Sequence, residues 1–338
     1  MIETRLKKLQ QQKRLRHRLR QRWLIFLLCC AVSVMAINLY TGDLRILGSK
    51  PIEPEPETTM TPSAPIFEER ETAMIITTEL DPVLIELSEL GEETILNYQI
   101  YKRYLNKAPV AEGTKTVYLT IDDGPNPKST EMVLEVLKEK DVPATFFVLG
   151  TMIKQFPELL MTINEAGHGI GNHGYTHIYS RIYSSANEFL WEINETNDLI
   201  KEVSGVETRL IRAPGGTTGH FTTEYYQVIE KAGYIEQDWN VDTKDSSAKN
   251  VSAKDIMDAV RYQSQGKQEV VVLFHDSGKV GILEALPQMI DYYLENGYQF
   301  AVLPQDRAVA THQPLVLQEI GRQVRTVLAK QASNNPGE

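Results

Sequence analysis

The sequence predicts an α/β fold, a distorted parallel (β/α) barrel with about seven strands. From about residue 114 to residue 305, short β-rich runs alternate with amphipathic segments of helical spacing. Polar or charged residues follow the ends of most of these runs. An open doubly wound sheet is the alternative. It would usually carry a glycine-rich phosphate loop after its first strand, where this chain has Asp-Asp-Gly-Pro.

The predicted strands and helices follow one another regularly. Strands are expected at 117–121, 144–149, 168–172, 209–212, 234–241, 269–275 and 298–303. Helices are expected at 130–140, 154–166, 186–203, 222–232, 253–263 and 283–295. Together they define a catalytic domain at 113–305. The tail at 306–338 is expected to hold one helical stretch and no chemistry.

The amino-terminal region predicts a membrane anchor. Residues 1–22 carry nine basic side chains and one acidic one, and residues 23–40 carry no charge. Such an apolar segment is long enough to cross about 30 Å of hydrocarbon as a helix. Because basic residues stay in the cytoplasm, we expect a single-pass protein of the cell membrane with an extracellular catalytic domain. A signal peptide cleaved near Ala36 and a buried core helix are the alternatives.

Two further segments separate this anchor from the barrel. Residues 41–66, rich in proline and glutamate, predict an extended linker. Residues 67–112 predict a stalk or small pre-domain, with a helix ending near Lys107. Both cysteines lie within 23–40, so any metal in the remaining chain must use His, Asp or Glu. Residues beyond 22 carry a strong net negative charge, which argues against nucleic acid as a partner.

Polar residues gather at the carboxyl ends of the expected strands, where the active site of a parallel barrel forms. In chain order these residues are Asp122, Asp123, His173, His177, Arg212, Asp242, Asp245, His275 and Asp276. Their origin in separate segments that a barrel would bring together is the strongest functional signal in the sequence.

The first two groups predict a metal site. Side chains alternate in direction along a strand, so one of Asp122 and Asp123 could bind a metal while the other faces substrate; a simple turn is the alternative. His173 and His177 are four residues apart, which in a helical turn places both on one face. Two imidazoles and a carboxylate with an open position form a catalytic metal site and favour Zn²⁺.

The later strand ends are more ambiguous when each is taken alone. Arg212 opens Arg-Ala-Pro-Gly-Gly, where the glycine pair would let backbone N–H groups approach a ligand closely. A surface loop explains the same residues. His275 ends an otherwise apolar run, so it is either a satisfied core residue or a catalytic acid.

Together, five segments resemble, in order, the motifs of the NodB-homology polysaccharide deacetylase family. They lie at 120–125, 172–177, 212–216, 239–245 and 273–276, and the resemblance covers about residues 114–305. It implies a hydrolase that removes the N-acetyl group from N-acetylglucosamine in a cell-surface polysaccharide. Peptidoglycan is the favoured substrate, and the enzyme would be of the peptidoglycan N-acetylglucosamine deacetylase type.

The resemblance also implies a role for each matched residue. The ligands of one divalent metal would be Asp123, His173 and His177. The catalytic residues would be Asp122 as general base, held by Arg212, and His275 as general acid, oriented by Asp245. The substrate-binding residues would be Gly215 through its backbone N–H, Leu273 against the acetyl methyl group, and Trp239.

Three positions depart from the family pattern. Gly174 stands where Ser or Thr is usual, so a hydrogen bond that braces the loop is expected to be absent. Ser246 stands where Trp is frequent, which removes one wall of the acetyl pocket. Gly215 stands where an aromatic residue is common, although only its N–H is required there.

Several alternatives remain open at the level of sequence. Co²⁺, Mn²⁺ and Ni²⁺ are alternatives to Zn²⁺. The scaffold could serve as an inactive glycan-binding protein, or as an esterase that removes O-acetyl groups. A non-haem Fe(II) oxygenase also uses two His and one carboxylate, but that chemistry has no need for Asp122, Arg212 and His275 around the metal.

Overall fold

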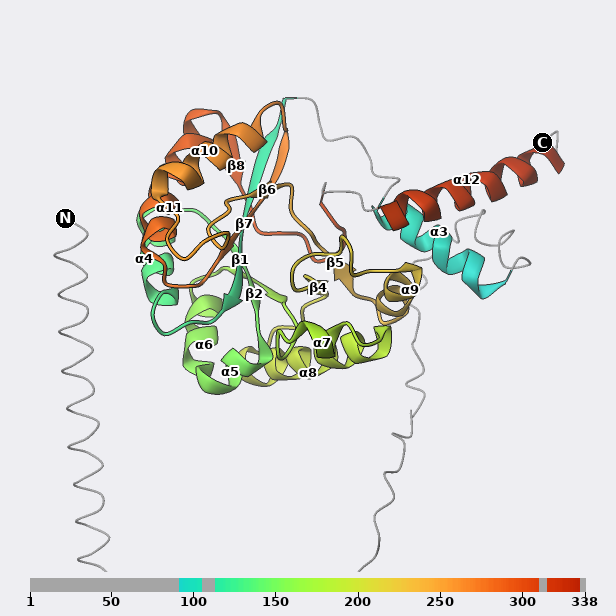
Figure 1. Ribbon diagram of the computed structural model, residues 1–338, viewed down its shortest axis with the longest axis horizontal. Coiled ribbons are helices and arrows are strands. Elements are labelled where there is room, and N and C mark those ends of the chain that lie inside the picture. Colours follow the sequence, from blue (N-terminus) through green and yellow to red (C-terminus); the bar gives the residue numbers. More distant parts are fainter. Residues whose placement is uncertain (1–90, 105–112, 310–314, 335–338) are drawn as a thin grey trace, which may run out of the picture. The chain divides into compact units, whose positions relative to one another are not determined.

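The computed structural model describes residues 91–104, 113–309 and 315–334 (Figure 1). The segments expected to be cytoplasmic, membrane-spanning and linking, and most of the expected stalk, lie outside these residues. Among the helices that are described, none combines the length and the apolar character needed to cross a membrane. Anchoring therefore stays a prediction.

The sheet consists entirely of parallel strand pairs, which confirms the predicted parallel α/β fold. The strands are β1 (Lys115–Gly124), β2 (Thr145–Val148), β3 (Gly169–Asn172), β4 (Leu210–Ile211), β5 (Ile235–Glu236), β6 (Val241–Asp242), β7 (Glu269–His275) and β8 (Tyr298–Phe300). Seven of them follow the path β5-β4-β3-β2-β1-β7-β6, and β8 pairs with β1. The chain therefore forms a half-barrel in which β1 pairs with β2, β7 and β8.

The prediction of a single strand at 234–241 is wrong. This stretch forms β5, which pairs with β4, and β6, which pairs with β7 at the other end of the path. Residues 237–240 join the two ends, and no strand pair links β5 to β6 within the described residues. The carbonyl of Gln237 accepts a hydrogen bond from Arg212 Nε at 2.8 Å, so the side chain of a site residue replaces a strand partner there.

Helices surround the sheet, as Figure 1 shows. They are α4 (Thr130–Lys140), α5 (Gly150–Gln155), α6 (Pro157–Glu165), α7 (Tyr179–Ile182), α8 (Ala186–Ser204), α9 (Thr223–Lys231), α10 (Ala253–Ser264) and α11 (Val280–Glu295). The helix predicted at 154–166 is two helices. Pro157 lacks a backbone N–H, so it ends one helix and occupies the first turn of the next.

Two core layers follow from the alternation of side chains along the central strands. Val117, Leu119 and Ile121 of β1 belong to one buried cluster, whereas Tyr118 belongs to a second. Strand β7 repeats this pattern, with Val271 on the Tyr118 side. A two-residue period then assigns the later residues of β1 and β7 to the same inner face. Four of these are site candidates or their neighbours: Thr120, Asp122, Leu273 and His275.

Two helices outside the predicted catalytic domain complete the second cluster. α3 (Glu92–Tyr104) contacts α9 and α12 (Leu315–Asn334), and the latter confirms the one helical stretch expected in the tail. Ile100 of α3 is fully buried. Arg103 binds both carboxylate oxygens of Glu230 at 2.7 Å, which attaches α3 to α9.

Candidate active site

Regular alternation along a strand predicted that the carboxylates of Asp122 and Asp123, at the end of β1, point in opposite directions. The structure shows that they do not. The register with β2 passes from Asp122–Phe147 to Gly124–Val148, so Asp123 is an extra, unpaired residue, with φ of +73°. This bulge re-aims its side chain. As a result, His173 Nε2 lies 3.7 Å from an Asp122 oxygen and 3.5 Å from an Asp123 oxygen.

His173 and His177 come together through a bent loop. The expected helical turn is absent, because Gly174 and His177 both adopt left-handed backbone conformations, with φ of +83° and +59°. The two rings nevertheless lie 5.3 Å apart between centroids. Each Nε2 atom is 3.5 Å from the same oxygen, Oδ1 of Asp123.

Glu192 of α8 braces this loop, and sequence reasoning missed it. Its buried carboxylate accepts hydrogen bonds from the N–H groups of Tyr175 at 2.9 Å and Thr176 at 2.8 Å. Asn172 Oδ1 accepts the N–H of Gly174 at 2.8 Å, so the bracing expected to be missing comes from other residues. The available signal was the position of Glu192, an acid within the buried face of an amphipathic helix.

The Asp123, His173 and His177 side chains fit a divalent cation. Asp123 Oδ1 is buried and has no hydrogen-bond partner within the described chain. His173 Nδ1 lies 2.9 Å from the Arg212 carbonyl, which can only accept, so its Nε2 keeps a free lone pair. Burial lowers the pKa of His173 to about 3, which keeps it neutral. Tetrahedral zinc ligands would lie about 3.4 Å apart, close to the 3.5 Å separations observed here.

Asp122 is fixed by the fully buried Arg212. Arg212 Nη1 donates to Asp122 Oδ1 at 2.9 Å and to Thr120 Oγ1 at 2.7 Å, while its guanidinium group stacks on Phe147 at 4.1 Å. Burial raises the pKa of Asp122 above its ordinary value, and the charge of Arg212 opposes that rise. The result is an immobilised carboxylate that is more basic than an exposed one.

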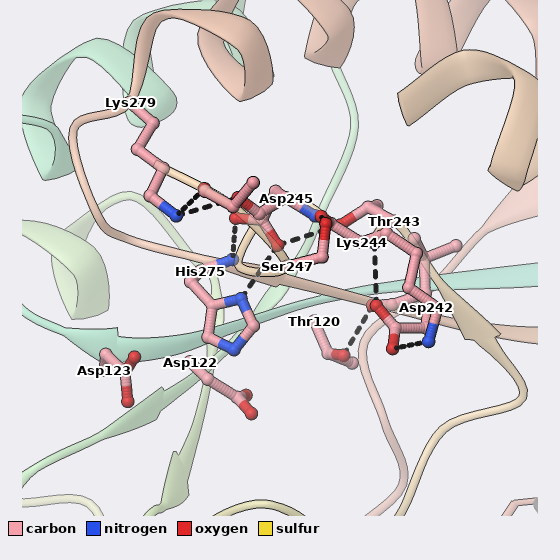
Figure 2. Close-up of polar contacts among 12 residues, drawn as sticks. Thr120, Asp122, Asp123, Asp242, Thr243, Lys244, Asp245, Ser247, His275 and Lys279 are labelled. Carbon is pink, nitrogen blue, oxygen red and sulfur yellow. Dashed lines mark hydrogen bonds and ion pairs between the residues drawn. The ribbon is translucent and has the colours of Figure 1, made fainter. Parts of the chain in front are cut away.

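His275 is fixed by both carboxylate oxygens of Asp245. Its Nδ1 lies 2.8 Å from Oδ1, its backbone N–H donates to Oδ2 at 3.1 Å, and Figure 2 shows the ring nitrogen directed toward Asp245. Burial alone lowers the pKa of His275, but the hydrogen bond and charge of Asp245 outweigh it and raise the pKa to about 9. His275 therefore carries a proton at neutral pH. Lys279 Nζ donates to the Asp245 carbonyl at 2.9 Å and holds this loop.

Residues 213–216 form a tight turn beside Arg212. Gly216 N–H donates to the Ala213 carbonyl at 2.8 Å, with Pro214 second and Gly215, at φ of +75°, third, which is the pattern of a type II turn. Tyr183 Oη donates to the Pro214 carbonyl at 2.7 Å. For the N–H of Gly215, the described residues provide no acceptor, so it is free to meet a ligand.

The other two predicted substrate-binding residues lie close to this constellation. Leu273 is 4% exposed and pairs in register with Thr120. Trp239 is half-buried, with its ring 5.7 Å from the Arg212 guanidinium carbon. Trp239 and Gly215 also line an open pocket of about 630 Å³.

Two acidic residues at strand ends serve other contacts. Asp242 binds Lys244 Nζ at 2.7 Å. Asp276 accepts hydrogen bonds from the Ser129 and Thr130 hydroxyls and from the backbone of Asn126. Neither residue joins the group around Asp123, and both stabilise local structure.

Comparison with known proteins places this chain in one family. Residues 110–236 match the family described as polysaccharide deacetylase. A peptidoglycan-N-acetylglucosamine deacetylase of Bacillus cereus is 32% identical over 190 residues, which cover 55% of this chain and 68% of that protein. A chitooligosaccharide deacetylase of Rhizobium leguminosarum bv. trifolii is 32% identical over 222 residues, 60% of this chain and 99% of that protein.

A solved structure extends the similarity to three dimensions. It is the catalytic domain of the peptidoglycan N-acetylglucosamine deacetylase from Eubacterium rectale, 30% identical, with a TM-score of 0.54. The match covers 61% of this chain and 96% of that one.

Proposed function

The chain belongs to the polysaccharide deacetylase family, and we propose that it hydrolyses the N-acetyl groups of N-acetylglucosamine residues in peptidoglycan. One observation carries this proposal: a carboxylate braced by Arg212 and an imidazole braced by Asp245 flank three side chains that could hold a metal ion. These residues are Asp122 and His275 as the flanking groups, and Asp123, His173 and His177 as the three side chains.

A divalent cation bound by these three side chains would supply Lewis-acid chemistry, activating water and polarising the acetyl carbonyl. Zn²⁺ is our first choice because two neutral imidazoles and one carboxylate suit it. Asp122 takes the proton of the attacking water, and its raised pKa favours that transfer. Arg212 Nη1 holds Oδ1 of Asp122, which leaves Oδ2, the oxygen on the His173 side, to receive the proton.

The remaining residues stabilise the negative charge that develops on the acetyl oxygen and protonate the leaving nitrogen. The free N–H of Gly215 donates to the acetyl oxygen as negative charge grows there. His275, protonated and oriented by Asp245, gives its Nε2 proton to the sugar nitrogen as the carbon–nitrogen bond breaks. The products are acetate and a glycan with a free amine.

The choice of peptidoglycan rests on the two similar deacetylases named for it and on the predicted topology. A catalytic domain held outside the cell membrane by residues 23–40 would meet the wall polysaccharide directly. The similar chitooligosaccharide deacetylase makes N-acetylglucosamine oligomers the second substrate to examine.

The test is mass spectrometry of purified peptidoglycan and of an N-acetylglucosamine tetramer after incubation with Zn²⁺-loaded protein. We expect loss of one acetyl group per reacted hexosamine, release of acetate, and new free amines. His275→Ala protein of equal metal content is the matched control. Acetate without free amines would indicate ester hydrolysis, and no acetate from either glycan would refute the proposal.

A further inference from the structure

Tyr179 lies beside His177 and Gly215 and has no role in the catalytic groups described above. It begins α7, two residues after the metal-ligand candidate His177, and its side chain is 43% exposed. Its ring meets the His177 ring edge-on, 5.4 Å apart between centroids. Behind it, the rings of Tyr183 and His220 lie 5.8 Å and 5.6 Å away and hold it in place.

The hydroxyl end of Tyr179 reaches the turn at Gly215. A Cβ atom built on Gly215 would lie 2.5 Å from Tyr179 Oη and 3.0 Å from Cε1. Tyr179 therefore occupies the space next to Gly215 where a side chain would begin, and the positive φ of Gly215 also favours glycine at this position. Tyr179 thus bridges His177 and the turn whose N–H is free.

The Tyr179 hydroxyl is available to a ligand. Within the described part of the chain, no hydrogen bond to Tyr179 Oη is formed, in contrast to Tyr183, whose hydroxyl is committed to the Pro214 carbonyl. A phenol can donate one hydrogen bond and present an apolar ring face at the same time, which suits a sugar carrying an acetamide group.

We propose that Tyr179 is a further catalytic residue, whose hydroxyl donates a hydrogen bond to the acetyl oxygen alongside the N–H of Gly215 and whose ring forms the sugar-binding wall beside His177. This inference rests on the proposed function and adds a side-chain donor to it. The second donor increases the stabilisation of the acetyl oxygen as it becomes negatively charged.

Two variants of Tyr179 separate the hydroxyl from the ring. A buried donor of this kind contributes on the order of 10² to 10³ in kcat, and we expect about tenfold for a half-exposed one. Tyr179→Phe should therefore lower kcat about tenfold and leave KM nearly unchanged. Tyr179→Ala should in addition weaken binding of an N-acetylglucosamine tetramer to metal-free protein by about fivefold, measured calorimetrically, because the ring wall is lost.

The controls distinguish this inference from the function on which it rests. Tyr262→Phe, on α10 and 77% exposed, should change neither kcat nor binding. Zn²⁺ content and thermal stability of Tyr179→Phe should equal those of the wild type. If the wild type releases acetate and Tyr179→Phe has the same kcat, this inference is overturned while the proposed function stands. If the wild type releases no acetate from either glycan, the proposed function itself fails.

Discussion

Asp122 and His275 pair directly across strands β1 and β7, and each is held by one residue of opposite charge, yet different forces dominate at the two positions. At Asp122, burial outweighs the attraction of Arg212, and the pKa rises. At His275, the hydrogen bond and charge of Asp245 outweigh burial, and the pKa rises to about 9. Arg212 donates to several acceptors, whereas both oxygens of Asp245 contact His275, and one of them also accepts from the Thr243 hydroxyl. The two positions therefore favour a base and an acid respectively.

The largest expected effect comes from removing either group. Asp122→Asn and His275→Ala should each lower kcat by about 10²-fold or more, because each removes one proton-transfer group. Both variants should bind Zn²⁺ as the wild type does, measured by metal analysis after dialysis. His173→Ala, in contrast, should lose the metal. A wild-type kcat in Asp122→Asn would contradict the assignment of Asp122 as the base, since only His275 of the two positions would then be catalytic.

Arg212→Lys tests how far the base depends on its brace. A single ammonium group cannot reproduce the bonds of the guanidinium fork to Thr120, Asp122 and the Gln237 carbonyl. We expect kcat/KM to fall tenfold or more and the free energy of unfolding to drop by about 2–4 kcal/mol, measured by urea denaturation. If Arg212→Lys keeps the stability and the kcat/KM of the wild type, the positive charge at position 212 matters and the guanidinium geometry does not.

Glu192→Gln leaves both proton-transfer groups intact and loosens the loop between the two imidazoles. The Glu192 carboxylate accepts hydrogen bonds from the N–H groups of Tyr175 and Thr176 and from the Thr176 hydroxyl. The single amide oxygen of Gln cannot accept all three. Residues that support metal ligands typically change affinity by 10- to 100-fold, and we expect about tenfold here. Competition with a zinc chelator measures the affinity. Saturating Zn²⁺ should restore kcat, and a kcat that stays low would assign Glu192 another role.

Tyr183→Phe should produce the smallest effect, roughly a fivefold decrease in kcat, because it removes one hydrogen bond, to the Pro214 carbonyl. That carbonyl and the N–H of Gly215 belong to one planar peptide group, so losing the hydrogen bond to the carbonyl also lets the N–H change its orientation. KM and Zn²⁺ affinity should not change. A rise in KM without a change in kcat would mean that the turn binds the sugar and does not stabilise the reacting oxygen.

The strand ends were predictable because each apolar run stops at a polar residue, and a parallel sheet gathers those ends at one edge. For this reason Asp122, His173, Arg212 and His275 could be found without a structure. The bulge at Asp123 could not, because one additional residue leaves the pattern of apolar residues in β1 unchanged.

Two other features depend on contacts from distant segments. The stretch at 234–241 has apolar residues at both ends and polar residues 236–238 between them, and its pairing with β4 at one end and β7 at the other divides it. Glu192 stands out in the sequence as an acid on the buried face of an amphipathic helix, but the N–H groups that it accepts come from a separate loop, at Tyr175 and Thr176. Neither partner is visible in the local sequence.

The pH dependence of kcat/KM, measured for the Zn²⁺-loaded wild type and for Asp245→Asn, tests the central claim most directly. In the wild type, activity should fall at alkaline pH as His275, whose pKa is raised by Asp245, loses its proton. Asp245→Asn removes the charge that raises this pKa and leaves the burial that lowers it, so the alkaline limb should move to lower pH while the acid limb stays in place. An alkaline limb at the same pH in both proteins would contradict the assignment of His275 as the acid.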